Sequence, residues 1–201
     1  MRHALILVDL QHDFLPGGAL AVPGGDAVLE PAIQHIHSGT YDLVVATQDW
    51  HPPGHESFAS VHADGAVGAL VELHGLPQVL WPDHCVQGTR GAELHPSIPR
   101  NRLAAVFQKG TNRTVDSYSG FFDNGRRHDT GLAAWLRERA VTRVTVLGLA
   151  TDYCVKWTAL DAHSEGFHTR VLTEASRGVN LRPGDVDNAL DELRAAGVEV
   201  V

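Results

Sequence analysis

The sequence has few of the features that mark several large classes of protein. No apolar run approaches the ~18 residues that a membrane span needs, so we expect no membrane partner. The start, Met1-Arg2-His3, leads into an apolar stretch without a small-residue cleavage site, which predicts a cytoplasmic protein without a secretory signal. Only two cysteines occur, Cys85 and Cys154. They are too few for a disulfide framework, and we expect free thiols in a reducing compartment.

Positive charge is also scarce. Sixteen Lys and Arg residues stand against twenty-four Asp and Glu, and the formal net charge of −8 disfavours a nucleic-acid partner. Lysine itself occurs only twice, as Lys109 and Lys156, beside fourteen arginines. Because Arg supplies the basic charge elsewhere, a lysine in this chain is a candidate for a role that Arg cannot fill.

The rest of the composition is that of an ordinary globular protein. The 201 residues are 43% hydrophobic and 20% charged, which argues against disorder and suits a single domain over residues 1–201. Thirteen histidines are present, enough to direct attention to metal binding or proton transfer.

Six short apolar runs rich in β-branched residues recur along the chain. Such runs are typical of strands that are buried on both faces of a parallel sheet. Helical periods lie between them, and this alternation predicts an α/β fold. We expect a three-layer, Rossmann-like architecture with a mostly parallel six-stranded sheet and helices on both faces. The expected strands are 4–8, 43–46, 104–107, 144–147, 169–172 and 198–201, and the expected helices are 27–37, 130–139, 152–164 and 186–196.

The regular pattern breaks at about residues 50–100. This segment is rich in Pro, Gly and His and shows no long amphipathic period. Because a stretch of this length without elements is uncommon in a compact domain unless it is functional, we expect a loop-rich excursion that covers and partly builds a site.

Chemically capable residues stand where the expected strands end. In open α/β sheets, ligands bind outside the carboxyl ends of the strands. Asp9, Asp49 and Lys109 end three of these strands, and the turn 150–154 follows a fourth. The fold can therefore bring two acids, a lysine and a cysteine together.

Cys154 is the stronger of the two cysteine candidates. It opens a helix, where the helix dipole and free backbone N–H groups favour a nucleophilic thiolate and can hold an oxyanion. The alternative is a small buried hydrophobic residue, as most free cysteines are, and position alone leaves the two open. Cys85 has no such context, and we interpret it as structural.

Asp9 and Lys109 also have ordinary interpretations. An Asp at a strand end is often a turn residue or a helix cap, and most lysines are solvated on the surface. Lys156 lies two residues after Cys154 on the expected helix, and side chains at that spacing do not face each other. If a lysine serves Cys154, Lys109 is therefore the better candidate.

Asp49 and His51 form a candidate metal pair. At an extended strand end, residues two apart lie on one side. With a distant histidine such as His84 they would form a three-ligand set with an open position. The alternative is a group of polar loop histidines, because spacing alone does not choose among those of the excursion. The others there are His55, His62, His74 and His95.

Six motifs follow one another in a fixed order between residues 6 and 161. They are ILVDLQHDF at 6–14, QDWHP at 48–52, WPDHCVQGT at 81–89, KG at 109–110, DSYSGF at 116–121 and GLATDYCV at 148–155. Together they resemble the isochorismatase-like cysteine hydrolases and, within that superfamily, the bacterial nicotinamidases, which also accept pyrazinamide. The block around His84 and the metal pair favour nicotinamidases over isochorismatases, which generally lack the metal site.

The resemblance implies roles for individual residues. Cys154 would be the nucleophile, Asp9 the acid/base and Lys109 the third catalytic member. The backbone N–H groups of Ala150 and Cys154 would form an oxyanion hole, and the Ala150–Thr151 peptide bond would be cis.

A metal site and a ring pocket are implied as well. One divalent ion would be held by Asp49, His51 and His84, with zinc expected and iron or manganese as alternatives. Ligation by Ser57 stays open, because family members differ at this position. The ring pocket would be lined by Phe14, Trp81 and Tyr118.

The implied reaction is the hydrolysis of nicotinamide, and also of pyrazinamide, to the acid and ammonia through a cysteine thioester, in NAD salvage. Two alternatives remain. One is a related cysteine amidase that acts on another small amide or ureido substrate. The other is a catalytically silent ligand-binding protein on the same fold, against which the intact triad argues. We expect a small-molecule substrate as partner and a monomer or small homo-oligomer.

Overall fold

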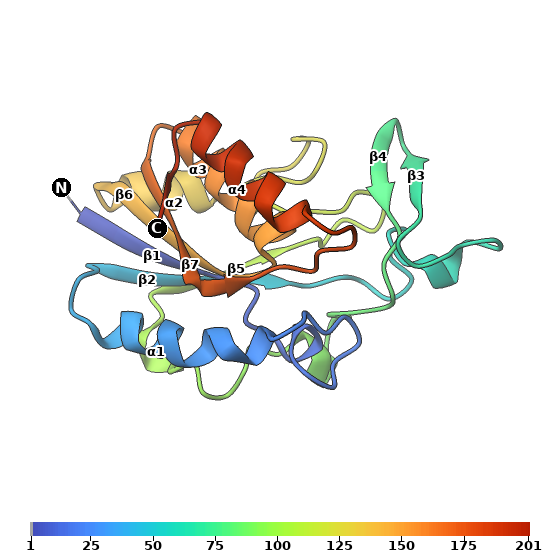
Figure 1. Cartoon of the computed structure of the whole chain (residues 1–201), viewed down its shortest axis with the longest axis horizontal. Coiled ribbons are helices and arrows are strands. Elements are labelled where there is room, and N and C mark those ends of the chain that lie inside the picture. The colour runs from blue at the N-terminus through green and yellow to red at the C-terminus, as the bar shows by residue number, and fades with distance from the viewer. Residues whose placement is uncertain (1) are drawn as a thin grey trace.

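A six-stranded sheet forms the centre of the computed structural model, which describes residues 2–201 (Figure 1). Its strand order is β5-β2-β1-β6-β7-β8, and every neighbouring pair is parallel. The α/β prediction is therefore confirmed. The strands are β1 (Arg2–Val8), β2 (Leu43–Asp49), β5 (Ala105–Lys109), β6 (Val141–Leu149), β7 (His168–Arg177) and β8 (Glu199–Val200).

The central strand β1 shows why the apolar runs become buried strands. Its side chains alternate between the two faces of the sheet. Leu5 and Leu7 enter one apolar cluster, and Ala4, Ile6 and Val8 enter another on the opposite face. All five are almost fully buried, so the strand needs apolar residues at every position.

Helices cover both faces and complete three layers (Figure 1). Ile36 of α1 packs in the cluster of Leu5, whereas Leu136, Ala159 and Leu193 of α2, α3 and α4 pack in the cluster on the other face. Within residues 2–201 no helix has the length and apolarity that a membrane span requires. The helices are α1 (Leu29–His37), α2 (Leu132–Glu138), α3 (Lys156–Ser164) and α4 (Asp185–Ala195).

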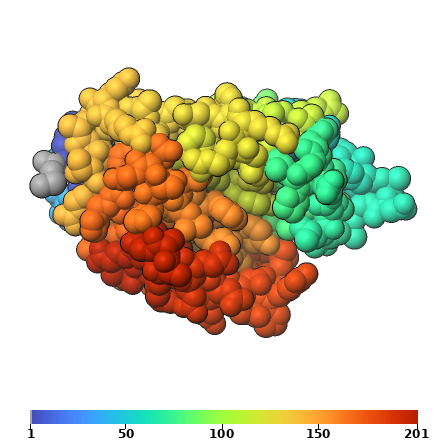
Figure 2. Space-filling view, turned by 90° about the horizontal axis from the view of Figure 1, so that it is seen from above, coloured from blue at the N-terminus to red at the C-terminus, as the bar shows by residue number. Residues whose placement is uncertain are grey.

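The segment between β2 and β5 contains a small hairpin that the sequence pattern did not predict. Strands β3 (Leu70–Leu73) and β4 (Leu76–Val79) pair antiparallel and project from the body (Figures 1 and 2). Each strand has only four residues, mostly exposed or half-buried, so no apolar run marks it. The two-residue turn has positive φ at His74 (52°) and Gly75 (78°), without the Asn-Gly signature that usually reveals such turns.

Because Gly148 has no Cβ atom, the two central strands β1 and β6 can lie as close together as they do. This gives the first prediction. A Cβ atom there would lie 2.2 Å from the carbonyl oxygen of Val8, and the residue has φ +127°. Gly148→Ala should therefore force β1 and β6 apart and lower the free energy of unfolding by about 3 kcal/mol in urea titration.

Gly17 provides a matched control. Its φ is also positive (+87°), but a Cβ there would meet no atom within 4 Å. Gly17→Ala should cost only the ~1–2 kcal/mol of the left-handed conformation. Equal losses in the two variants would show that the contact with Val8 is unimportant.

Candidate active site

Four residues with ionisable side chains, two acids, a lysine and a cysteine, lie together at the carboxyl edge of the sheet. Asp9 follows β1, Asp49 ends β2 and Lys109 ends β5, where the strand register pairs it with Asp49. Cys154 lies in the turn after β6. The four residues are at most 7% exposed. Charged residues are seldom buried so deeply unless they are paired.

The ammonium group of Lys109 joins the other three. Its Nζ atom lies 2.9 Å from Asp9 Oδ2 and 2.9 Å from Asp49 Oδ1. It also donates to the carbonyl oxygen of Ser117 at 2.9 Å and lies 3.4 Å from Cys154 Sγ. Burial opposes the charge, but the two carboxylates raise the pKa of Lys109 well above its usual value. The interpretation as a solvated surface lysine is excluded.

The two carboxylate oxygens of Asp9 have different partners. Oδ1 accepts a hydrogen bond from Thr47 Oγ1 at 2.6 Å. Oδ2 forms the ion pair with Lys109 but accepts no hydrogen bond with good geometry from residues 2–201. Burial raises the pKa of Asp9, against the effect of Lys109. This oxygen is therefore a good candidate for a proton acceptor.

Cys154 is surrounded by groups that change the acidity of its thiol. Burial raises the pKa of its thiol well above the usual value, and the charges of Asp9 and Asp49 add to this effect. Lys109 acts in the opposite direction without reversing it. Together these effects favour the thiol form of Cys154 over the thiolate. The Cys154 sulfur and the Asp9 carboxylate both contact the Lys109 ammonium group.

The turn that carries Cys154 begins with an irregular peptide bond. The cis bond joins Leu149 and Ala150, so the prediction of a cis bond at Ala150–Thr151 is wrong by one residue. The reason is that the carbonyl of Ala150 already belongs to the following helix, where it accepts from the N–H groups of Tyr153 at 3.1 Å and Val155 at 3.0 Å. Residues Thr151–Val155 form a π-helical turn, a feature frequent at functional sites. Within residues 2–201, the N–H of Ala150 has no hydrogen-bond acceptor.

Asp49, His51 and His84 converge on one point. Asp49 Oδ2 lies 3.2 Å from Nε2 of His51 and 3.4 Å from Nε2 of His84. The carbonyl oxygens of Gly110 and Pro82 lie 3.0 Å and 2.7 Å from the respective Nδ1 atoms. A carbonyl only accepts, so Nδ1 carries the proton and leaves Nε2 free to ligate.

The charge of this group also fits a cation. Burial opposes protonation of His51, but Asp49 raises the pKa of His51 to about 9. The buried Asp49 carboxylate, which stabilises a proton on His51, would stabilise a divalent metal ion at the same position. The donor set, one carboxylate and two imidazoles, is one that zinc, iron and manganese accept.

His55 and Ser57 lie beside this group. Ser57 Oγ is 2.7 Å from His55 Nδ1, and His55 Nε2 is 2.8 Å from the carbonyl oxygen of Asn112. Both ring nitrogens of His55 are thus engaged, and the question of ligation by Ser57 stays open. The remaining histidines of the excursion bond elsewhere: His62 and His74 to Glu56, and His95 to Ser97.

Asp116 belongs to the site although the sequence analysis gave it no role. Its Oδ1 lies 3.9 Å from Nε2 of His51, and its Oδ2 accepts from the side-chain amide of Gln78 on β4 at 3.0 Å. Its place in a motif after Lys109 was the only signal in the sequence, and spacing did not reveal its direction.

An aromatic pocket adjoins Cys154 and the metal-ligating group. Trp81 donates from Nε1 to the hydroxyl of Tyr118 at 3.2 Å, and the rings of Phe14 and His84 meet edge to face at 5.5 Å. The three residues predicted for the ring pocket therefore do line one cavity. Its full lining is Phe14, Leu20, Asp49, Trp81, His84, Asp116, Tyr118, Ala150, Tyr153, Cys154 and Val179.

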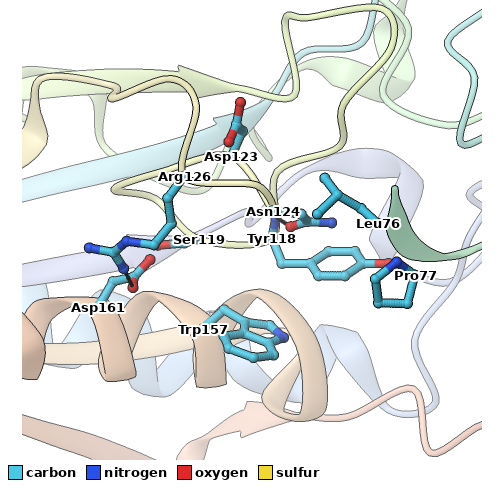
Figure 3. A pocket seen from close by; sticks show the side chains of 9 residues that line it. All are labelled: Leu76, Pro77, Tyr118, Ser119, Asp123, Asn124, Arg126, Trp157 and Asp161. Atoms are coloured by element: carbon cyan, nitrogen blue, oxygen red, sulfur yellow. Dashed lines mark hydrogen bonds and ion pairs between the residues drawn. The ribbon is translucent and has the colours of Figure 1, made fainter. Parts of the chain in front are cut away.

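A second pocket shares Tyr118 as a wall (Figure 3). It lies between β4, the loop after Tyr118 and α3, with Leu76, Pro77 and Trp157 as its apolar walls. Arg126 there is already ion-paired with Asp161. None of the four convergent residues lines this pocket, so the chemistry belongs to the cavity around Cys154.

Comparison with known proteins agrees with this geometry. The family described as Isochorismatase domain matches residues 3–201. The chain belongs to the isochorismatase family. This confirms the resemblance drawn from the motifs.

Several members of the family are similar over almost their whole length. The nicotinamidase of Escherichia coli K12 is 52% identical over 96% of this chain and 92% of its own. A nicotinamidase/pyrazinamidase structure from Acinetobacter baumanii has a TM-score of 0.95 at 41% identity, covering 100% and 95% of the two chains. A pyrazinamidase from Pyrococcus horikoshii, solved with zinc, has a TM-score of 0.80 at 38% identity, covering 100% and 99%.

The two lysines of the chain provide the second prediction. Lys109→Met leaves two buried carboxylates without their cation, and we expect the free energy of unfolding to fall by about 3–5 kcal/mol. Lys156 forms a surface pair with Glu192 at 3.0 Å, and Lys156→Met should cost at most ~1 kcal/mol. Urea unfolding of the metal-free proteins measures both values. Similar small losses would mean that Asp9 and Asp49 do not depend on Lys109.

Proposed function

We propose that the chain is a nicotinamidase that hydrolyses nicotinamide, and also pyrazinamide, to the acid and ammonia through a thioester on Cys154. One observation carries this proposal: Lys109 contacts Asp9, Asp49 and Cys154 beside an aromatic pocket. A thiol, a carboxylate base and a cation are the groups that nucleophilic amide hydrolysis needs. The similar nicotinamidases support the choice of substrate.

The first half of the reaction forms the thioester. Asp9 Oδ2 takes the proton of the Cys154 thiol, and Lys109 stabilises the thiolate. The sulfur attacks the carboxamide carbon, a C–S bond forms and the carbonyl π electrons move to oxygen. The N–H groups of Ala150 and Cys154 hold this oxyanion. The C–N bond then breaks as Asp9 returns its proton to the leaving nitrogen, which departs as ammonia.

The second half releases the acid. Asp9 takes a proton from water, the hydroxide attacks the thioester carbon, and the C–S bond breaks with its electron pair on sulfur. Asp9 and Cys154 share the remaining proton again, and Lys109 restrains both groups throughout. The raised pKa of Asp9 makes it a stronger base for the weakly acidic thiol.

Asp49, His51 and His84 would hold one divalent metal ion, which we infer to be zinc. The zinc-containing pyrazinamidase of Pyrococcus horikoshii supports this choice. When bound, the ion supplies a ligand position for the pyridine nitrogen and so orients the ring, which is catalysis by positioning. Phe14, Trp81 and Tyr118 enclose the ring from its sides.

The setting in the cell follows from the same proposal. The reaction belongs to NAD salvage, and two buried free thiols suit the reducing cytoplasm. Residues 1–201 would act as one domain, with the segment at about 50–100 supplying Trp81 and His84 to the site.

The third prediction separates the two cysteines. Cys154→Ala should lower kcat for nicotinamide at least about 10³-fold, because no other nucleophile replaces the thiol. Cys85 is also fully buried, and burial raises the pKa of its thiol well above the usual value, but it has no contact with Lys109. Cys85→Ala should keep most activity. Steady-state ammonia release measures both variants, and an active Cys154→Ala enzyme would refute the thioester route.

The fourth prediction tests the role of the metal ion. Benzamide has the same amide as nicotinamide but no ring nitrogen, so its reactive carbon is poorly positioned and its kcat/KM should be ~100-fold lower. His84→Ala or removal of the metal by a chelator should depress nicotinamide hydrolysis but leave alkylation of Cys154 by iodoacetamide largely unchanged. Equal rates for the two amides on the metal-loaded enzyme would contradict ring anchoring and indicate a structural ion.

A further inference from the structure

Two side chains in the segment after β1 have no part in the mechanism above. Gln11 and Asp13 follow Asp9 at steps of two residues. Gln11 is fully buried at 0% exposure, and Asp13 is half-buried. Gln11 forms hydrogen bonds to the backbone of Asp49, and Asp13 forms one to the backbone next to His84, in addition to its bond from the N–H of Ala19 at 3.2 Å.

Gln11 binds both backbone groups of Asp49 with one side chain. Its Oε1 accepts from the N–H of Asp49 at 2.8 Å, and its Nε2 donates to the carbonyl oxygen of Asp49 at 2.8 Å. The second hydrogen on Nε2 goes to the carbonyl oxygen of Ala92, also at 2.8 Å. The amide thus has no spare donor, and its orientation is fixed.

The early end of strand β1 explains why the backbone of Asp49 needs these hydrogen bonds from Gln11. The pairing of β1 with β2 ends at Leu7 and Ala46, three residues before Asp49. On the side of β1, the N–H and carbonyl of Asp49 therefore have no strand to pair with. Gln11 supplies one donor and one acceptor in the place where β1 would have continued.

The position of Asp49 affects both halves of the site. Its Oδ1 contacts Lys109 at 2.9 Å, and its Oδ2 faces His51 and His84 at 3.2 Å and 3.4 Å. Any rotation of its backbone would move a carboxylate that the lysine and both histidines share.

Asp13 acts next to His84, another of the three candidate metal ligands. Its Oδ2 accepts from the N–H of Cys85, the residue after His84, at 2.7 Å. Cys85 has φ +46°, so the chain turns sharply at this bond. Gly91 makes room for the carboxylate, because a Cβ there would lie 2.1 Å from Asp13 Oδ2.

We propose that Gln11 and Asp13 are positioning residues of the metal centre. They hold the backbone at Asp49 and at Cys85, and so direct the side chains of Asp49 and His84 toward a common point. They also connect that point to the segment that carries Asp9. This role rests on the proposed metal-assisted function. Groups that orient metal ligands typically change metal affinity by about 10- to 100-fold when they are removed.

Gln48 provides a matched control for Gln11. Its Nε2 donates to the same carbonyl oxygen of Ala92 at 2.8 Å, and its Oε1 accepts from Gln108, but its side chain bonds to no metal-ligating residue. Gln48→Met and Gln11→Met therefore each remove one hydrogen bond to the carbonyl oxygen of Ala92, and only Gln11→Met also removes the two bonds to Asp49.

The experiment titrates zinc into the metal-free full-length chain in competition with a chromophoric chelator. We expect the zinc Kd to rise ~10- to 100-fold in Gln11→Met and to change less than about threefold in Gln48→Met. Asp13→Ala should raise the Kd in the same direction as Gln11→Met. At limiting zinc the KM for nicotinamide should rise in the Gln11 variant, and saturating zinc should restore it, which a general loss of structure would not allow.

Gln11→Glu is a second test of the same residue, for the case that Gln11→Met does not fold. It has nearly the same size and still accepts from the N–H of Asp49, but its ionised form donates to neither carbonyl. It should also weaken zinc binding, with thermal melts of the metal-free protein as the check on folding. Unchanged zinc Kd in the folded Gln11 variants would overturn the proposal, as would an equal loss in Gln48→Met. If the wild-type chain hydrolyses nicotinamide but binds no zinc, the metal centre and this role both fail while the thioester chemistry stands.

Discussion

The site depends on one buried ammonium group. Lys109 lies between the carboxylates of Asp9 and Asp49, and neither the lysine nor the acids would be stable as ions at this depth without the others. One ammonium against two carboxylates leaves a surplus negative charge. His51, with its pKa raised to about 9, can balance it, and a divalent ion at the same place would do so as well. The proposed catalytic residues and the proposed metal ligands are therefore one electrostatic unit joined through Asp49.

Burial also sets the proton chemistry of the nucleophile. The same loss of water raises the pKa of the Cys154 thiol and of the Asp9 carboxyl, while Lys109 lowers both. A less acidic thiol is thus paired with a more basic carboxylate, and a single proton can pass between them in each half of the proposed reaction. The site does not need a permanently ionised cysteine, which would be exposed to unwanted oxidation and alkylation.

The sequence predicts the strands of the sheet and the polar residues at its carboxyl edge, because both can be recognised from short stretches of sequence. Apolar runs buried on two faces reveal the strands, and Asp9, Asp49 and Lys109 are conspicuous where those runs end. The β3–β4 hairpin lacks such a run and was missed. Asp116 and Gln11 were missed for another reason: the partners of Gln11 lie 38 and 81 residues away in the sequence, and no spacing rule encodes such contacts. The raised pKa of the Cys154 thiol likewise comes from burial and from the charges of Asp9 and Asp49, which are far from it in the sequence.

The end of β1 shows how the sheet makes room for chemistry. Strand pairing with β2 stops at Leu7, and Asp9 takes a left-handed conformation (φ 49°) that turns the chain away from β2. An uninterrupted strand would satisfy the backbone of Asp49 but would fill the space where Asp9 meets Lys109 and Cys154. Because buried backbone groups left unpaired are costly, the early end of β1 requires a substitute, and the side chain of Gln11 has the donor and acceptor to be one. Asp9, where the chain turns and leaves space for the site, and Gln11, which bonds to the unpaired backbone of Asp49, are therefore only two positions apart in the sequence.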